Sequence, residues 1–288
     1  YFFGSNALKS LRYVTIELKH IYRQQDKQFI DILASIRENR VTNEVIDALN
    51  ARYIPGFSVE SDAEETDVQN MWIHLTTHNR TANAYNEKRM ERLKVSEHTF
   101  TAKIEGVFPE YSYPTDVTLN LKVGAQVMFV KNDSSPEKRY YNGKMGIVDD
   151  IVSEGIVVKT RNETTAATEY IVVSTEVWEN IKYSLDEKTK EIKEEVEGVF
   201  RQYPLRLAWA ITVHKSQGLT FSHAVLDVNH SFAHGQVYVA LSRCRSLEGL
   251  VLSSPLNTRS IITDSRVGDF VHYAIVHSQT AQQYLPMQ

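Results

Sequence analysis

Residues 207–228 read LAWAITVHKSQGLTFSHAVLDV, and this stretch decides how the C-terminal part of the chain is interpreted. Its first half, Leu207 to Gln217, predicts a helix whose C′ residue is Gly218, because glycine often follows the last helical turn. Its second half, His223 to Val228, is mostly apolar, as in a buried parallel strand. A helix that leads directly into such a strand is typical of an α/β layer.

Strands and helices continue to alternate beyond this stretch. Gly235 to Arg243 predicts a helix, and Gly249 to Leu252 predicts another short buried strand. Further upstream, Met71 to Leu75 predicts a strand that runs into a helix ending near Leu93. This alternation predicts a doubly wound α/β sheet.

The first seventy residues contain two predicted helices and an acidic loop. Asp26 is a plausible N-cap for a helix with apolar residues at helical spacing, namely Phe29, Ile30, Leu33 and Ile36. A second short helix is expected to begin at Thr42. Residues 57–70 are acidic and rich in turn formers, so we interpret them as a solvated loop.

Residues 99–200 have a different character, with short β-like runs punctuated by glycine. Their regular spacing predicts a small antiparallel barrel, with Asn142-Gly143 as a tight turn. Residues 181–196 predict a hairpin with its turn at 186–190, and a charged helix across 186–197 is the competing interpretation. We therefore expect an α/β domain, residues 1–98 and 201–288, that is interrupted by an inserted β domain, residues 99–200.

The composition limits the classes of function. The chain has 288 residues, 42% hydrophobic and 24% charged, as in ordinary globular proteins. A net charge of −4 argues against a protein that coats DNA, although not against one that touches phosphates at a few points. The one cysteine, Cys244, excludes a disulfide framework and indicates a reducing, intracellular setting. There is no apolar run long enough for a membrane span, and the absence of an initial methionine suggests a fragment.

The sequence contains no G-x-x-x-x-G-K-[ST] run and no Asp-Glu pair at the end of an apolar strand, so it does not predict a complete P-loop nucleotide hydrolase. Two arginines nevertheless lie at positions from which they could contact a bound nucleotide. Arg23 comes just before a helix cap and Arg243 ends a mostly apolar helix, from which each can reach a γ-phosphate across a cleft. The alternative for each is a surface salt bridge.

Two polar segments could hold an anion. Thr76 to Asn79 lies where a predicted strand meets a helix, so its backbone N–H groups can face a phosphate, although an ordinary N-cap is the alternative. Residues 214–217 place four side chains that can donate hydrogen bonds directly before Gly218, so they could also contact an anion. The alternative is an ordinary helix end with an exposed basic residue. His223, His230 and His234 lack a carboxylate or cysteine that would complete a metal site, so we predict none.

Three segments, in order, resemble motifs IV, V and VI of the superfamily-one helicases, and most closely those of the PIF (petite integration frequency) family. They are LKHIYRQ at residues 18–24, AITVHKSQG at 210–218 and GQVYVALSR at 235–243. LTTHN at 75–79 and LKVGAQVM at 121–128 are weaker matches to the same family. The resemblance covers nearly the whole chain, and the family's first motor domain has no counterpart in this sequence.

The resemblance implies the C-terminal half of such a helicase, with a RecA-like parallel sheet, helices on both faces and an inserted Src-homology-3-like barrel. It implies that Arg23 and Arg243 contact a γ-phosphate, and that Gln217, Gly218 and Gln236 lie on the ATP side. The DNA-binding residues that it implies are Thr76, His78, Asn79, His214, Lys215 and Ser216, on a helix in the case of the last three. ATP and magnesium would be held mainly by the missing N-terminal domain.

The implied activity is ATP-driven 5′-to-3′ movement on single-stranded DNA with unwinding of duplex. The expected partners are single-stranded, forked or structured DNA and the chain's own N-terminal motor domain, in a monomer without membrane contact. The location would be the cytoplasm in a bacterium or phage, and the nucleus or mitochondrion in a eukaryote. The alternatives are a catalytically inactive nucleic-acid-binding module and a RecD-like helicase.

Overall fold

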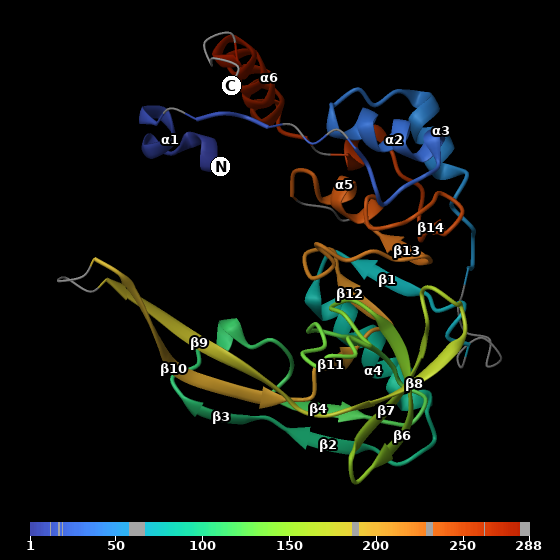
Figure 1. Ribbon diagram of the computed structural model, residues 1–288. Helices are drawn as coiled ribbons and strands as arrows, with labels where there is room; N and C mark the ends of the chain where they lie inside the picture. The colour runs from blue at the N-terminus through green and yellow to red at the C-terminus, as the bar shows by residue number, and fades with distance from the viewer. Residues whose placement is uncertain are drawn as a thin grey trace. The chain divides into compact units, whose positions relative to one another are not determined.

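A computed structural model describes most of the chain and divides it into two compact units (Figure 1). Unit one comprises Tyr1–Pro55 and Leu226–Gln288, and unit two comprises Gly56–Val225. The described residues are 1–11, 13–16, 18, 20–57, 67–185, 190–228, 233–261 and 263–282, without the side chains of 277–282. Most of the predicted loop at 57–70 and of the predicted turn at 186–190 therefore lies outside them.

Unit one is mostly helical. Asp26 caps α2 (Lys27–Arg37), as predicted, because its carboxylate accepts hydrogen bonds from the backbone N–H groups of Gln28 and Phe29. The predicted helix after Thr42 is also confirmed as α3 (Asn43–Asn50), which buries Ile46 and Leu49. The remaining elements of this unit are η1 (Phe2–Gly4), α1 (Asn6–Ser10), α5 (Gln236–Leu241), β14 (Leu250–Leu252), η3 (Thr258–Ser260) and α6 (Ser265–Gln282).

A four-stranded sheet has the order β12-β1-β13-β14, with β1 (Ile73–Thr76), β12 (Ala210–Thr212) and β13 (Ala224–Asp227). β1 and β12 pair in parallel, with His74 opposite Ala210 and Thr76 opposite Thr212. The predicted helix after β1 is α4 (Asn79–Arg92), which packs against β1 and β12 (Figure 1). The predicted α/β class is therefore confirmed, with a parallel sheet and helices accompanied by antiparallel sheets.

The predicted helix from Leu207 to Gln217 is wrong. The chain is extended through β11 (Leu205–Leu207) and β12, and only then turns, where the N–H of Ser216 donates to the carbonyl of Thr212 at 3.1 Å. Residues 208–213 are all buried, so the run is apolar on both faces, a pattern that periodicity cannot distinguish from a buried helix. Gly218, with φ +83°, follows this turn and caps no helix.

Unit two also contains antiparallel sheets. A five-stranded sheet has the order β11-β5-β6-β7-β8, and the Asn142-Gly143 turn between β5 and β6 has φ +98° at the glycine, as predicted. Its core includes Val127, Phe129 and Ile156. The new strands are β5 (Gln126–Phe129), β6 (Met145–Val152), β7 (Gly155–Arg161) and β8 (Thr168–Val173).

The predicted hairpin is confirmed over the competing helix, because β9 (Glu176–Leu185) pairs antiparallel with β10 (Ile192–Gln202) and projects as a long arm (Figure 1). β10 also pairs with β3 (Lys103–Gly106), and β2 (His98–Thr101) pairs with β4 (Thr118–Leu121). A 3-10 turn, η2, spans Glu110–Ser112. The domain boundaries at 98/99 and 200/201 stay a prediction. Within the described residues, none of the helices is long and apolar enough to cross a bilayer.

The outer edge of β12 is closed by one side chain of α4. β12 is an edge strand, so the N–H and C=O of Ala210 that point away from β1 need other partners. The buried amide of Asn86 supplies both, since its Nδ2 donates to the Ala210 carbonyl at 2.9 Å and its Oδ1 accepts from the Ala210 N–H at 2.8 Å. This reciprocal pair fixes α4 against the sheet.

Replacement of Asn86 by alanine is therefore expected to lower the free energy of unfolding by about 1–3 kcal/mol, because it leaves two buried backbone groups without a partner. Urea denaturation followed by circular dichroism measures this. The matched control is Asn83→Ala on the same helix, which removes an exposed amide and should change stability by no more than about 0.5 kcal/mol. Equal losses in the two variants would mean that the Asn86 pair does not hold the edge.

Candidate nucleotide and nucleic-acid sites

In unit one, a cavity of about 130 Å³ contains both of the arginines that the sequence singled out. Arg23 reaches it from the segment before α2, and Arg243 from the residues that follow α5. Apolar side chains of α2, such as Leu33, form part of its wall. We call this cavity the arginine cleft.

The end of α5 holds the first of these arginines in place. Arg23 donates through Nη1 to the carbonyl of Ser242 at 2.9 Å. The buried Gln24 amide donates to the same carbonyl at 3.2 Å and to that of Cys244 at 2.9 Å. The last carbonyls of a helix lack partners within the helix, so they accept these side-chain donors readily. A segment from the N-terminal part of the chain is thereby fixed beside Arg243.

Arg243 is oriented by its own helix. Its Nε donates to the Val239 carbonyl at 3.0 Å and its Nη2 to the Ser242 hydroxyl at 2.9 Å. Burial lowers the pKa of the Arg243 guanidinium, and the neighbouring charge of Arg23 lowers it further. Two like charges that face one small cavity repel each other, and an anion between them would relieve this repulsion.

A third arginine, Arg37, which no sequence pattern indicated, lines the arginine cleft from the last turn of α2. It also forms an exposed ion pair with Glu38, at 3.3 Å. A basic residue in the last helical turn is an ordinary feature, so its sequence position carries no functional signal. Gln236, predicted on the ATP side, is buried at the start of α5 and is not among the described residues that line the cleft.

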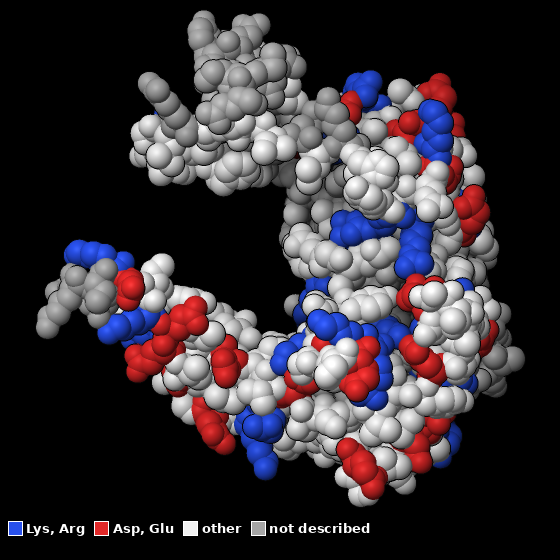
Figure 2. Space-filling model, in the orientation of Figure 1, with Lys and Arg blue, Asp and Glu red and all other residues white. Residues whose placement is uncertain are grey.

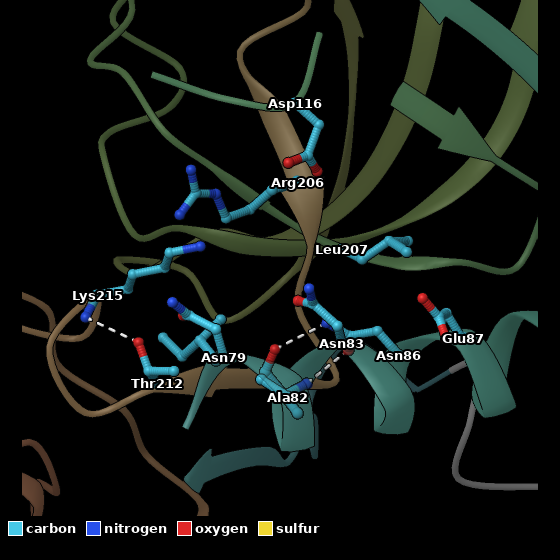
Figure 3. Close-up of a pocket in the computed structure, with 12 residues that line it drawn as sticks. Asn79, Ala82, Asn83, Asn86, Glu87, Asp116, Arg206, Leu207, Thr212 and Lys215 are labelled. Carbon is cyan, nitrogen blue, oxygen red and sulfur yellow. Dashed lines mark hydrogen bonds between the residues drawn. The ribbon is translucent and has the colours of Figure 1, made fainter. Parts of the chain in front are cut away.

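In unit two, a second pocket of about 250 Å³ lies where α4, β11 and β12 meet (Figure 3). It brings together the predicted DNA-binding residues Asn79 and Lys215, and it adds Arg206, which the sequence analysis missed. Asp116 enters from the loop before β4. We call this cavity the α4 pocket.

Between β11 and β12, beside this pocket, the chain passes from the five-stranded sheet to the four-stranded sheet. This crossing brings the two cations of the pocket together. Arg206 precedes the crossing on β11, and Lys215 follows β12. Gln126 secures the crossing, since its amide donates to the carbonyls of Ala208 and Trp72, both at 2.8 Å. Figure 3 shows Arg206 and Lys215 on the same side of the pocket.

Burial and neighbouring charges shift the pKa of both cations. Arg206 donates to the Pro114 carbonyl at 2.8 Å, and burial lowers the pKa of its guanidinium while Asp116 opposes this shift. Much of the Lys215 side chain is exposed, but partial burial at the pocket lowers the pKa of its ammonium group, and the charge of Arg206 lowers it further. Asp116 acts in the opposite direction on Lys215.

The other predicted DNA-binding residues differ in how accessible they are. Thr76 and Ser216 are buried, and their hydroxyls donate to the backbone carbonyls of His78 and Val213 at 3.1 and 2.7 Å. His78 is exposed at the N-cap of α4, and its Nδ1 lies 2.7 Å from the Thr77 hydroxyl. His214 is exposed, as are the predicted ATP-side residues Gln217 and Gly218, in the turn after β12.

In the described part of the chain, no group of three or more histidine, cysteine, aspartate and glutamate side chains is placed to hold a metal ion. His230 lies outside that part. Burial raises the pKa of Cys244 to about 12, so its thiol is a packing group rather than a nucleophile at neutral pH.

No protein-family model matches the chain. The ATP-dependent DNA helicase Pif1 of Bdellovibrio bacteriovorus is 31% identical over 266 residues, which cover 89% of this chain and 53% of that protein. The crystal structure of a Bacteroides Pif1 with ADP-AlF4 is similar with a TM-score of 0.79 and 35% identity, over 96% of this chain and 60% of that one. Bacteroides Pif1 bound to single-stranded DNA gives a TM-score of 0.64 and 36% identity, over 95% and 59% of the two chains. The chain thus spans about half the length of the curated relative and three fifths of the solved chains.

The pKa of Lys215 provides a test of the α4 pocket. Arg206→Gln removes a neighbouring positive charge and should raise the pKa of Lys215, whereas Asp116→Asn removes a negative charge and should lower it. An NMR titration of the lysine Cε and Nζ signals measures both shifts. Arg201→Gln, at an exposed position on β10, is the control and should leave Lys215 unchanged. If Arg206→Gln has no more effect than the control, the two cations do not share the pocket in solution.

Proposed function

The chain is a homologue of the Pif1-family DNA helicases over most of its length, and on this premise we propose that it is the C-terminal motor half of an ATP-dependent 5′-to-3′ DNA helicase. In this role it binds single-stranded DNA and presents arginines to an ATP molecule that is held mainly by an N-terminal domain. Its similarity to Bacteroides Pif1 structures with ADP-AlF4 and with single-stranded DNA supports both parts of the proposal.

The pairing of Arg23 and Arg243 in one cleft is the observation that carries the nucleotide part of the proposal. Guanidinium groups are suited to phosphate oxygens, because their donors form a rigid planar fork. In the proposed mechanism they approach the γ-phosphate when the two halves close, and their charge stabilises the transition state of phosphoryl transfer. Arg23 keeps its position through the Ser242 carbonyl while it does so.

Magnesium is implied by this chemistry, and when bound with ATP it would neutralise charge on the phosphates. The described side chains that line the arginine cleft are cationic, neutral polar or apolar and include no carboxylate, so they fit phosphate oxygens and do not fit a metal ion. We therefore assign to this chain the phosphate contact, and to the N-terminal domain the P-loop lysine and the metal ligands.

The α4 pocket and the turn after β12 form the proposed DNA contact. Lys215, Arg206 and Asn79 can donate to phosphate oxygens without reading sequence, and the exposed His78 and His214 can add to them. The buried Thr76 and Ser216 would support the backbone of this surface through their own hydrogen bonds. Gln217 and Gly218 follow Lys215 within the same turn, so we propose that this turn couples nucleotide state to the grip on DNA.

The experiment that tests the nucleotide part compares this chain alone with a two-domain protein in which it is joined to an N-terminal helicase half. The chain alone should hydrolyse no ATP, since its sequence has no P-loop run. In the two-domain protein, Arg243→Ala or Arg23→Ala should reduce DNA-stimulated ATP turnover by about 10³-fold or more, with DNA affinity retained. A coupled ATPase assay and fluorescence anisotropy measure the two properties.

Arg40→Ala is the matched control, because Arg40 is an exposed arginine of unit one that does not line the cleft. Its turnover should equal that of the wild type. Thermal unfolding of each variant separates loss of function from loss of fold. Full turnover in Arg243→Ala would refute the proposed finger, and an inactive two-domain protein that still binds DNA would favour the non-catalytic binding module.

The DNA contact has its own test. Lys215→Ala should weaken the binding of this chain to single-stranded DNA and should reduce the slope of log affinity against log salt by about one, as expected for the loss of one phosphate contact. Lys27→Ala removes an equal charge from an exposed site on α2 and is the control. An unchanged salt slope in Lys215→Ala would place the DNA elsewhere.

A further inference from the structure

The α4 pocket is not simply a basic groove. Arg206 and Lys215 occupy one side of it, but Asp116 and Glu87 also line it, and Figure 3 shows Glu87 on the side away from the two cations. Asp116 partly offsets the repulsion between the two cations, but a carboxylate away from them, such as that of Glu87, would only repel a phosphate. The mixture of charges indicates a ligand with an anionic end and an end that donates hydrogen bonds.

Some polar side chains of α4 hydrogen-bond to the neighbouring backbone, and others are exposed to solvent. Asn86 is fully engaged by Ala210, as described above. Asn83 and Glu87, four residues apart and therefore on one helix face, are exposed, and neither side chain hydrogen-bonds to another described residue that lines the pocket. Their amide and carboxylate are thus available to a ligand.

The wall that carries Asp116 is fixed to the β11 strand. The Thr115 hydroxyl donates to the Leu205 carbonyl at 2.7 Å, and Arg206 donates to the Pro114 carbonyl at 2.8 Å. Both contacts are made by the two residues directly before Asp116, which lines the pocket from this tethered loop. Preorganised polar groups of this kind favour specific binding, because little ordering remains to be done when a ligand enters.

The pocket also has an apolar part and enough room for a ring. Leu207, Ala82 and Ile211 contribute to its lining. Its volume of about 250 Å³ is several times the roughly 30 Å³ that one water molecule takes up in the liquid. A nucleobase has the required shape and chemistry, with apolar ring faces and a polar edge.

We propose that the α4 pocket takes one nucleobase of the bound strand, with Arg206 and Lys215 on the adjacent phosphate and with Glu87 and Asp116 accepting hydrogen bonds from the base. This inference rests on the proposed DNA contact and adds a base preference to it. Carboxylates accept from the exocyclic amino groups of cytosine and adenine and from the amino and ring N–H groups of guanine. Thymine has no amino group, and its one ring N–H lies between two carbonyl oxygens that repel a carboxylate, so it is the base that the pocket disfavours.

Fluorescence anisotropy with this full chain and two labelled oligonucleotides of equal length, all dC and all dT, tests the preference at a fixed salt concentration. The pair is matched, because both bases are pyrimidines and differ at the group that the carboxylates would read. The wild-type chain should bind the dC strand about fivefold more tightly, as one base contact of modest strength allows. Glu87→Gln and Asp116→Asn each replace an acceptor oxygen with an amide nitrogen and should bring the ratio towards one.

Arg206→Gln should weaken binding to both strands by the same factor, because phosphate contacts do not discriminate between bases. Glu91→Gln is the control for Glu87, being an exposed glutamate one turn further along α4 and outside the pocket lining. Equal affinities for dC and dT in the wild type, or an unchanged ratio in both carboxylate variants, would overturn the base pocket alone. Failure of the chain to bind either strand would overturn the proposed DNA contact and this inference together.

Discussion

The parallel pairing of β12 with β1 is the constraint on which the rest of unit two depends. It sets Thr76 opposite Thr212, so that α4 and the turn after β12 both begin at the same end of the paired strands. Asn86 then closes the free edge of β12 with two hydrogen bonds to Ala210. These bonds fix the distance between α4 and the edge strand β12, and the α4 pocket is the space that remains between these two elements and β11.

The arginine cleft follows a different physical principle. Two like charges, Arg23 and Arg243, face one cavity, and burial together with the charge of Arg23 lowers the pKa of Arg243. The carbonyls of Val239, Ser242 and Cys244 orient this segment without neutralising it. Such a cleft suits the proposed contact with a phosphate, which would reduce this repulsion on binding.

The charge distribution reconciles a negative chain with the proposed nucleic-acid partner. The net charge is −4, and Figure 2 shows acidic and basic side chains interspersed over the visible face, including the β9–β10 hairpin. A general electrostatic attraction for DNA is therefore weak, and the proposed binding would rely on local contacts such as Lys215 and Arg206. Local contacts are also what a translocating protein requires, since each must be made and released in turn.

The sequence by itself determined the local elements and the family. Asp26, with apolar residues at helical spacing after it, specified α2, and alternation with turn residues specified the β9–β10 hairpin, because capping and periodicity act over a few neighbouring residues. Residues 208–213 resemble part of a helix in sequence because they are buried on both faces, and only the pairing of Ala210–Thr212 with β1 makes a strand there. The functional partners of Arg206 and Arg37 were also decided only by tertiary structure, since the residues that share their cavities lie far away in the chain and no local pattern connects them.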